Sequence, residues 1–286
     1  RSWSPVFFSV HREQRDALLA EGWNSIEVGS EMVVDPRVWK TTGKKWQDVR
    51  TAINKAKRDG ITDVQSTFLE SPLEVREQIE DISEEWAQLK ALPEMKFTLG
   101  GVEELRDPRV RLLYAVDADG RVLGVTSWLP TWRDGRVIGW TLDFMRHRTD
   151  SPNGIMEFLI ARMAERLRDE GAADPERAAE FMSLSAAPLA GMNPERDNAG
   201  EGGAPAGEGT QVLQHALQIV ADWMEPAYGF HSLFNFKRKF QPTEAPVYVC
   251  YPDPAALPQI GLAVVRAYVP SVTPAEVAGM LSTLRS

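Results

Sequence analysis

An acid and a base stand three residues apart in the stretch Asp143-Phe144-Met145-Arg146, at the end of a run typical of a β-strand. An aspartate at the exit of a central strand can orient a hydroxyl group or a cationic amine. An arginine beside it can hold a phosphate or stabilise a developing oxyanion. The alternative is a surface ion pair that closes the sheet. The pair therefore defines a candidate centre for polar group transfer, with a structural role left open.

A second candidate is the stretch Ser151-Pro152-Asn153-Gly154, which precedes a predicted helix. The free N–H groups of a helix N-terminus bind anions, and a glycine there permits close approach of the backbone. We expect Asp150 or Ser151 to cap the helix, with Pro152 in its first turn. Glu157 follows one turn later. Ordinary capping without a ligand is the alternative.

A third candidate is the segment from Phe234 to Phe240, in which aromatic residues alternate with Lys237, Arg238 and Lys239. Such a segment can hold a phosphate through its bases while its rings pack in the core or along lipid. It can equally be a helix that buries the rings and leaves the lysines in solvent.

Several classes of chemistry find no support in the sequence. Ser183 and Ser185 lie outside any G-x-S-x-G elbow and have no evident histidine and acid partners, which argues against a covalent serine mechanism. The four histidines are scattered and Cys250 is the only cysteine, so we expect no metal. The loop that cradles acetyl-CoA in acetyltransferases is not found between the predicted strands and helix. We therefore expect no cofactor.

The stretch from Lys40 to Gly60 is basic in an acidic protein. It holds seven basic and two acidic residues, a net charge of +5, whereas the whole 286-residue chain has a net charge of −9. In a helix, Trp46, Val49, Ile53 and Ala56 form one apolar stripe, with bases on the opposite face. A local basic excess suits a polyanion such as a phosphate backbone or lipid headgroups. A solvated surface helix is the alternative.

The order of predicted elements indicates an α/β fold with a mixed sheet. Strands are expected at 3–10, 25–34 and 61–68, and three β segments from Arg109 to Met145 are separated by the turns Asp119-Gly120 and Asp134-Gly135. A helix, a strand and a basic-aromatic segment follow, then a strand at 247–251 and C-terminal helices. This order is that of acetyltransferase-like (GNAT) folds. No apolar run reaches the length of a membrane span.

Taken together, four stretches resemble one family. They are GKKWQDVRTAINKAKRDGI, LDFMRHRTDSPNGIMEFL, SLSAAPLAG and LFNFKRKFQPTEAPVYVCYP. From about Glu27 to Pro252 the chain resembles the C-terminal cytosolic domain of the aminoacyl-phosphatidylglycerol synthases, also called multiple peptide resistance factors. The resemblance implies two tandem GNAT-like folds joined by the basic helix. It divides the chain into 1–60, the remainder of an incomplete first lobe with the basic helix, and 61–286, a second lobe. The low-complexity composition of residues 191–209 predicts a mobile loop there, longer than the family needs.

The resemblance also implies a reaction, partners and a location. Members transfer an amino acid, lysine or alanine for this chain, from aminoacyl-tRNA to the hydroxyl of phosphatidylglycerol or a related lipid. They work at the cytoplasmic face of the bacterial membrane, with an N-terminal membrane domain expected in the full-length protein.

Site residues follow from the matching positions. The implied catalytic residues are Asp143, Arg146, Glu157, Lys237 and Glu244. The implied tRNA-binding residues are Lys44, Lys45, Arg50, Asn54, Lys55 and Arg58. The implied lipid or phosphate ligands are Asn153, Ser185, Lys237 and Lys239. Thr243 replaces an expected aromatic residue and His147 an expected arginine, differences that bear on the acceptor more than on the reaction class.

Two other functions remain open on the sequence. One is a GNAT-like aminoacyl or acyl transferase with a non-lipid acceptor, such as a peptide or cell-wall precursor. The other is a non-catalytic module that binds RNA or an anionic membrane through the basic helix. Substitution of Asp143 and Arg146 distinguishes this module from both enzymes. In an enzyme, the substitutions should stop turnover while binding of the ligand survives.

Overall fold

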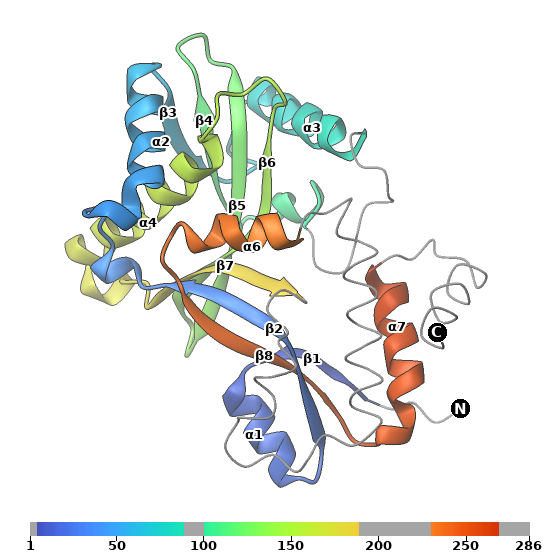
Figure 1. The fold of residues 1–286 in the computed structure, drawn as a ribbon. Coiled ribbons are helices and arrows are strands. Elements are labelled where there is room, and N and C mark those ends of the chain that lie inside the picture. Colours follow the sequence, from blue (N-terminus) through green and yellow to red (C-terminus); the bar gives the residue numbers. More distant parts are fainter. Residues whose placement is uncertain (1–4, 89–99, 189–229, 269–286) are drawn as a thin grey trace.

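A single mixed sheet organises the molecule in this computed structural model, which describes residues 5–88, 100–188 and 230–268 (Figure 1). Its eight strands lie in the order β1-β8-β2-β7-β6-β5-β4-β3. Every neighbouring pair is antiparallel except β6 and β7, which are parallel. The strands are β1 (Phe7–Val10), β2 (Asn24–Val34), β3 (Thr62–Ser66), β4 (Arg111–Val116), β5 (Val122–Arg133), β6 (Arg136–His147), β7 (Phe181–Pro188) and β8 (Thr243–Tyr251).

The meander β4-β5-β6 forms as the sequence predicts, because both turns have the chemistry that tight hairpins need. Asp134 and Gly135 both have positive φ, 51° and 77°, as the two central residues of a type I′ turn require. At the other turn, Asp117 Oδ1 accepts the N–H groups of Asp119 at 3.0 Å and Arg121 at 2.9 Å. These turns set the register that carries β6 to the centre of the sheet.

The candidate site lies at the parallel pair of β6 and β7. Their pairing covers only Gly139–Thr141 against Phe181–Ser183, although both strands continue further. On β6, Asp143 and Phe144 together face Ser127 of β5. On β7, Leu184 and Ser185 together face Met32 of β2. Each strand therefore carries a β-bulge just beyond the last shared pair, and bulges redirect side chains next to functional sites.

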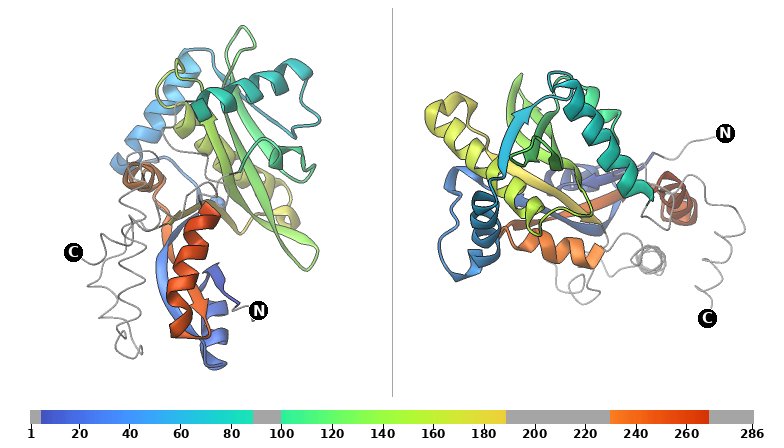
Figure 2. Two further views of the ribbon diagram at one scale, coloured as in Figure 1. Left: turned by 90° about the vertical axis from the view of Figure 1, so that its right-hand side faces the viewer. Right: turned by 90° about the horizontal axis from the view of Figure 1, so that it is seen from above.

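Helices cover both faces of the sheet. They are α1 (Arg12–Ala20), α2 (Gln47–Arg58), α3 (Leu73–Gln88), α4 (Ile155–Ala173), α6 (Phe230–Arg238) and α7 (Leu257–Tyr268). Residues of α2 and α4 share one core cluster with the sheet, whereas residues of α3 belong to a second. Figure 2 shows α3 on the side away from α2 and α6. A third cluster joins α7 to β2 and β8.

The basic helix forms in the predicted place, with a 3₁₀ turn at Lys44–Trp46 leading into α2. Its predicted apolar stripe is confirmed, since Trp46, Val49 and Ala56 are buried and Ile53 packs against the same core. The stripe rests on α4. A Cβ on Gly154 would lie 3.0 Å from the Cβ of Ala52, so the close approach of the two helices depends on this glycine.

The predicted cap of the helix after β6 is wrong. The helix begins at Ile155, and Gly154 with φ of 97° is its N-cap. Ser151 instead donates its hydroxyl to the carbonyl of Leu123, and Asp150 pairs with Arg121 at 2.7 Å. The two expected capping side chains therefore fasten the preceding loop to the β4–β5 turn and to the start of β5.

Some predicted segments lie outside the described residues, namely the loop at 191–209 and the last C-terminal helix. The division of the chain near residue 60 stays a prediction. Strands from both sides of that division share the sheet, because β2 pairs with β7 and β8.

Candidate functional site

Lys237 is a buried ammonium at the bulged end of β7. It lies in the last turn of α6 and is 4% exposed. Its Nζ donates to the carbonyls of Ser185 at 3.3 Å and Ala186 at 3.1 Å. Burial lowers the pKa of Lys237 to about 8, and the negative charge of Glu31 opposes that shift. The lysine remains mostly protonated at pH 7, in a place where an anionic ligand would gain strongly from its charge.

Ser185 supplies one of these carbonyls from a strained backbone. Its φ is 66°, in the left-handed region that non-glycine residues seldom adopt. The N–H of Ser185 donates to Ser183 Oγ at 3.0 Å, and its hydroxyl donates to the carbonyl of Leu142. The hydroxyl that the sequence assigned to a lipid or phosphate thus holds the ends of β6 and β7 together. The strain points the carbonyl of Ser185 at Lys237.

Asp143 occupies the matching bulge on β6, directly after Leu142. Its carboxylate accepts the N–H of Gly100, and a Cβ on Gly100 would lie only 1.9 Å from Asp143 Oδ2. Burial raises the pKa of Asp143, the negative charge of Glu104 raises it further, and the Gly100 N–H acts in the opposite direction. This carboxylate is held in a fixed position and has an increased affinity for a proton, as a group that accepts or orients one requires.

Arg146 is part of the packing between β6 and α3. It is 4% exposed, and its Nη1 donates to the carbonyl of Ser83 at 3.2 Å and to the Ser83 hydroxyl. The guanidinium lies 4.2 Å from the ring centroid of Trp86 and 4.5 Å from that of Phe144. These contacts fix α3 against the strand that carries Asp143. The predicted direct role of Arg146 stays a prediction, and its surroundings indicate positioning.

Glu157 and Lys239 form a third group of site residues, on the first turn of α4 and just after α6. Lys239 Nζ lies 2.8 Å from Glu157 Oε1 and 5.4 Å from the ring centroid of Phe236. Glu244, on β8, lies 3.9 Å from Arg238 Nε at the surface. The ring of Phe240 is fully buried, so the aromatic-basic segment both packs its rings and engages its lysines.

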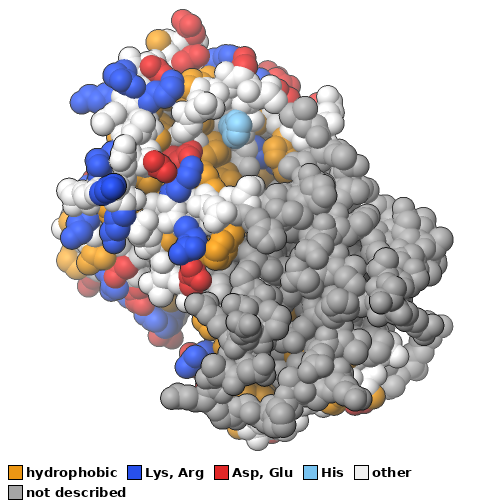
Figure 3. All heavy atoms as spheres, in the orientation of Figure 1, with side chains coloured by type: hydrophobic (Ala, Val, Ile, Leu, Met, Phe, Trp, Pro, Cys, Tyr) orange, Lys and Arg blue, Asp and Glu red, His pale blue; other side chains and the backbone are white. Residues whose placement is uncertain are grey.

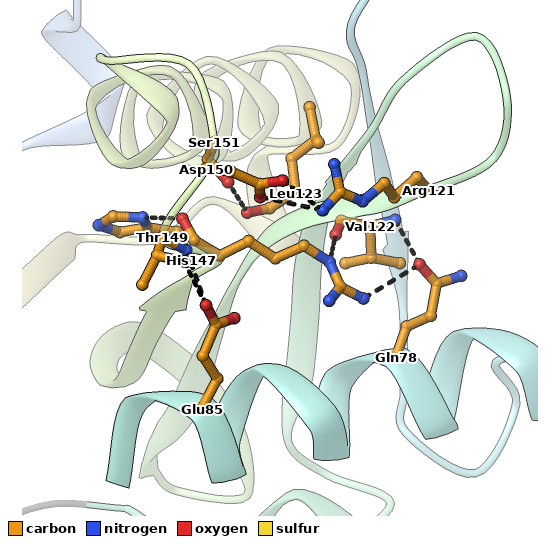
Figure 4. Close-up of polar contacts among 10 residues, drawn as sticks. Gln78, Glu85, Arg121, Val122, Leu123, His147, Thr149, Asp150 and Ser151 are labelled. Carbon is orange, nitrogen blue, oxygen red and sulfur yellow. Dashed lines mark hydrogen bonds and ion pairs between the residues drawn. The ribbon is translucent and has the colours of Figure 1, made fainter. Parts of the chain in front are cut away.

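The loop between β6 and α4 is fastened from two sides (Figure 4). Thr149 donates its hydroxyl to Glu85 of α3, and Arg148 Nε donates to the carbonyl of Val122 at 2.8 Å. Gln78 of α3 accepts the N–H of Val122 at 2.8 Å. These contacts hold the start of α4 in place. Asn153 is exposed in this loop.

The predicted tRNA-binding residues divide into two classes. Lys44, Lys45, Asn54 and Arg58 are exposed, and Figure 3 shows Lys and Arg side chains gathered along the side of the molecule where α2 lies. Arg50, in contrast, donates Nη1 to the carbonyls of Thr41 at 2.6 Å and Gly43 at 2.5 Å. Lys55 pairs with Asp59 at 2.5 Å. Arg50 therefore shapes the turn that enters the helix, while the exposed residues are open to a polyanion.

The Lys237 group and the Asp143 group both lie at the bulged ends of β6 and β7. The hydrogen bond from Ser185 to Leu142 connects the Lys237 group to the strand position next to Asp143. Lys239, the partner of Glu157, follows Lys237 by two residues in the chain. Residues 1–251 match the family model described as phosphatidylglycerol lysyltransferase, C-terminal.

The chain belongs to this family.

Relatives agree with the assignment to the phosphatidylglycerol lysyltransferase C-terminal family. An uncharacterized protein of Corynebacterium glutamicum is 38% identical over 94% of this chain and 32% of its own length. The phosphatidylglycerol lysyltransferase of Bacillus subtilis is 25% identical over 88% of this chain and 26% of its own. The lysylphosphatidylglycerol biosynthesis bifunctional protein LysX of Mycobacterium tuberculosis is 25% identical over 93% of this chain and 21% of its own length. The chain spans about a third or less of these relatives.

Solved structures show the same fold. L-PGS from Bacillus licheniformis superposes with a TM-score of 0.70 at 22% identity, over 92% of this chain and 72% of that one. The C-terminal domain of a putative lysylphosphatidylglycerol synthetase from Agrobacterium fabrum superposes with a TM-score of 0.67 at 21% identity, over 92% of this chain and 71% of that one. The predicted mixed α/β fold of this family is confirmed.

Two further observations concern the described part of the family domain. None of its helices combines the length and the apolar character of a membrane span. Nor does it bring three or more histidine, cysteine, aspartate or glutamate side chains into an arrangement that could hold a metal ion.

Sequence reasoning missed three residues of the candidate site in this family domain, Gly100, Glu104 and Glu31, and it weighed Ser183 only as a nucleophile. Gly100 and Glu104 surround Asp143, and Glu31 and Ser183 lie near Lys237. The Gly100-Gly101 pair was a readable signal, because adjacent glycines often mark a close backbone approach. Glu31 and Ser183 gave no local signal, since only the pairing of β2 with β7 brings them together.

Proposed function

We propose that this chain transfers an aminoacyl group from aminoacyl-tRNA to the hydroxyl of phosphatidylglycerol or a related anionic lipid. The observation that carries the proposal is the match of residues 1–251 to the phosphatidylglycerol lysyltransferase family. The buried ammonium of Lys237 and the held carboxylate of Asp143 support it, because the reaction needs a cation near developing negative charge and an acceptor for a hydroxyl hydrogen bond.

The reaction is a transesterification. The lipid hydroxyl oxygen attacks the carbonyl carbon of the aminoacyl ester, and the bond from that carbon to the tRNA ribose oxygen breaks. The proton of the lipid hydroxyl ends on the ribose oxygen, so the step needs no oxidant, reductant or nucleotide. Because the ester is already reactive, positioning and charge stabilisation account for much of the required rate increase.

Asp143 and Lys237 have separate roles in this proposal. Asp143 accepts a hydrogen bond from the attacking hydroxyl, and its raised proton affinity suits the transfer of that proton. Lys237 places its positive charge beside the lipid phosphate or the oxyanion that forms at the ester carbon. Arg146 acts through packing, because it fixes the strand that carries Asp143 against α3.

The exposed bases of α2 and of the 3₁₀ turn before it give the tRNA a binding surface in this proposal. Lys44, Lys45 and Arg58 are exposed on a segment whose net charge is +5 in a chain of −9. Such a concentration of bases attracts the phosphate backbone and favours one approach direction. We propose that the acceptor stem lies along α2 and that its aminoacylated 3′ end reaches the bulged ends of β6 and β7.

The test uses charged tRNA and defined lipid. Total tRNA is charged with one radiolabelled amino acid at a time and mixed with the chain and with vesicles of phosphatidylglycerol or phosphatidylcholine. The proposal predicts label in the organic phase with phosphatidylglycerol and with lysine or alanine. Label that moves only to added peptides or cell-wall precursors would favour a non-lipid acceptor, the alternative that a GNAT-like fold leaves open. Tight tRNA binding with no transfer to any acceptor would favour the non-catalytic module.

A further inference from the structure

Glu31 lies at the same place in the sheet as the carbonyls that bind Lys237. It belongs to β2, where it faces Ala186 of β7 in the antiparallel ladder. The carbonyl of Ala186 accepts the ammonium of Lys237 at 3.1 Å. The ladder thus brings a carboxylate from the N-terminal part of the chain to the buried lysine of α6.

Both carboxylate oxygens of Glu31 are engaged. Oε1 accepts the hydroxyl of Ser183, and Oε2 lies 2.5 Å from His11 Nε2. Ser183 Oγ also accepts the N–H of Ser185 at 3.0 Å, so the serine that orients Glu31 also holds the strained residue that binds Lys237. The side chain of Glu31 is 16% exposed, which limits screening of its charge by water. Its orientation is therefore set by the same bulge that shapes the lysine site.

Burying an ammonium in this place requires a compensating charge. The carbonyls of Ser185 and Ala186 offer dipoles but no net charge, and a lone buried ammonium tends to lose its proton. Glu157 of α4 pairs with Lys239, and Glu244 of β8 lies near Arg238. The carboxylate whose charge acts on Lys237 is Glu31.

We propose that Glu31 is a positioning residue of the site, a fixed counter-ion held by Ser183 and His11 that keeps the buried Lys237 in its charged form. The inference rests on the proposed function, because that proposal gives Lys237 its place in the reaction. It also makes β2 a part of the reaction centre, although β2 lies in the segment that the sequence separates from the second lobe. The charge that acts on Lys237 is that of Glu31 from β2, whose own partner is His11. The two bases that follow Lys237 in the chain, Arg238 and Lys239, lie against Glu244 of β8 and Glu157 of α4.

The test follows the charge of Lys237 directly. The side-chain Nζ signal of Lys237 is titrated by NMR in the chain, and Lys237→Met identifies that signal. Glu31→Gln removes the charge but keeps an oxygen that accepts from Ser183. We expect this variant to move the midpoint of Lys237 to lower pH by about one pH unit or more. Glu31→Asp keeps the charge and restores much of the wild-type midpoint. Glu13→Gln, an exposed change on α1, leaves it in place.

Transfer activity is measured on the same variants. The high-pH limb of the transfer rate is expected to move with the Lys237 midpoint in Glu31→Gln and to return toward wild type in Glu31→Asp. An unchanged midpoint in a folded Glu31→Gln variant, checked by its near-UV circular dichroism, would overturn the inference. So would an equal shift in Glu13→Gln. A shifted midpoint in a chain whose wild type shows no transfer supports the counter-ion and counts against the proposed function alone.

Discussion

Lys239 and Glu157 form an ion pair, with 2.8 Å between Nζ and Oε1, that joins the end of α6 to the first turn of α4. The sequence assigned the lysine to the lipid and the glutamate to catalysis, and the structure makes them partners. Their pairing fixes the distance between α6, which carries Lys237, and the helix that follows the Asp143 strand. The two side chains should therefore act as one unit.

A double-mutant cycle tests this unit. Glu157→Gln and Lys239→Met are each expected to weaken transfer, and the double variant to lose less than the sum of the two. The coupling should be about 0.5–1 kcal/mol in stability, because Lys239 is 35% exposed and water screens the pair. Urea unfolding and the transfer rate of all four proteins measure it. Additive effects in both measurements would show that the pair is only a surface contact.

Replacement of the buried Lys237 should stabilise the fold and abolish transfer. Burial lowers the pKa of Lys237 from 10.5 to about 8, so the unfolded chain holds the proton more tightly than the folded chain. Below pH 8 this difference costs stability, and the cost disappears as pH rises from 8 to 10.5. Lys237→Met should therefore raise the free energy of unfolding by about 1–3 kcal/mol at pH 7, after the loss of two hydrogen bonds to carbonyls.

The pH dependence isolates this effect from other titrating groups. Urea unfolding of wild type and Lys237→Met is compared at pH 7 and at pH 9.5. The stability advantage of the variant should shrink at the higher pH, because wild-type Lys237 then loses its proton. A difference that stays constant with pH would contradict the burial of a charged lysine.

Arg146 should matter for stability as well as for activity. Arg146→Lys keeps the charge but loses the planar group that lies against the rings of Trp86 and Phe144. We expect a loss of about 1–3 kcal/mol, since a buried cation–π contact and a hydrogen bond to Ser83 are both weakened. Arg106, which lies 5.3 Å from the Phe68 ring centroid at the surface, is the matched control. Equal losses in Arg146→Lys and Arg106→Lys would contradict a packing role for Arg146.

The exposed bases near α2 should control tRNA affinity and its salt dependence. A triple variant of Lys44→Gln, Lys45→Gln and Arg58→Gln is expected to bind tRNA more weakly. The slope of log affinity against log salt should fall by about 2–3, because up to three phosphate contacts are lost. Arg50→Gln serves as a comparison. The Arg50 guanidinium holds two backbone carbonyls. Arg50→Gln should therefore lower the free energy of unfolding and leave the salt slope nearly unchanged. Fluorescence anisotropy at several salt concentrations measures the affinity and the salt slope, and urea unfolding measures the stability.

Gly100 should be required for the position of Asp143. A Cβ at Gly100 would lie 1.9 Å from Asp143 Oδ2, so Gly100→Ala has to push the carboxylate away. Transfer should fall at least about 10-fold, in line with the cost of a misplaced catalytic group. Binding of tRNA should not change. Gly101→Ala is the control, since its Cβ meets only the end of the Glu104 side chain at 3.0 Å. Similar rates for the two variants would remove Gly100 from the account.

Local patterns explain what the sequence predicted well. The hairpin at Asp134-Gly135 and the apolar stripe of α2 depend on neighbouring residues, and both appear as expected. Lys237 was recognisable because its segment alternates bases and rings. These features require no knowledge of how distant strands pair.

Long-range pairing explains what the sequence did not reveal. The bulges at Asp143 and Ser185 arise from the registers of β5 with β6 and of β2 with β7. The same β2–β7 register brings Glu31 to Lys237. The helix cap was misplaced because Ser151 has a closer partner in the carbonyl of Leu123. Each of these depends on segments that are far apart in the chain.

The most direct test of the account is a single-turnover transfer from charged tRNA to phosphatidylglycerol vesicles, with label counted in the organic phase. Wild type is compared with Asp143→Asn and with Asp119→Asn, a change in the exposed β4–β5 turn. Labelled lipid is expected with wild type and Asp119→Asn, and a loss of about 100-fold or more is expected with Asp143→Asn while tRNA binding persists. A folded wild-type chain that binds charged tRNA but labels no lipid, or an Asp143→Asn variant with a wild-type rate, would contradict it.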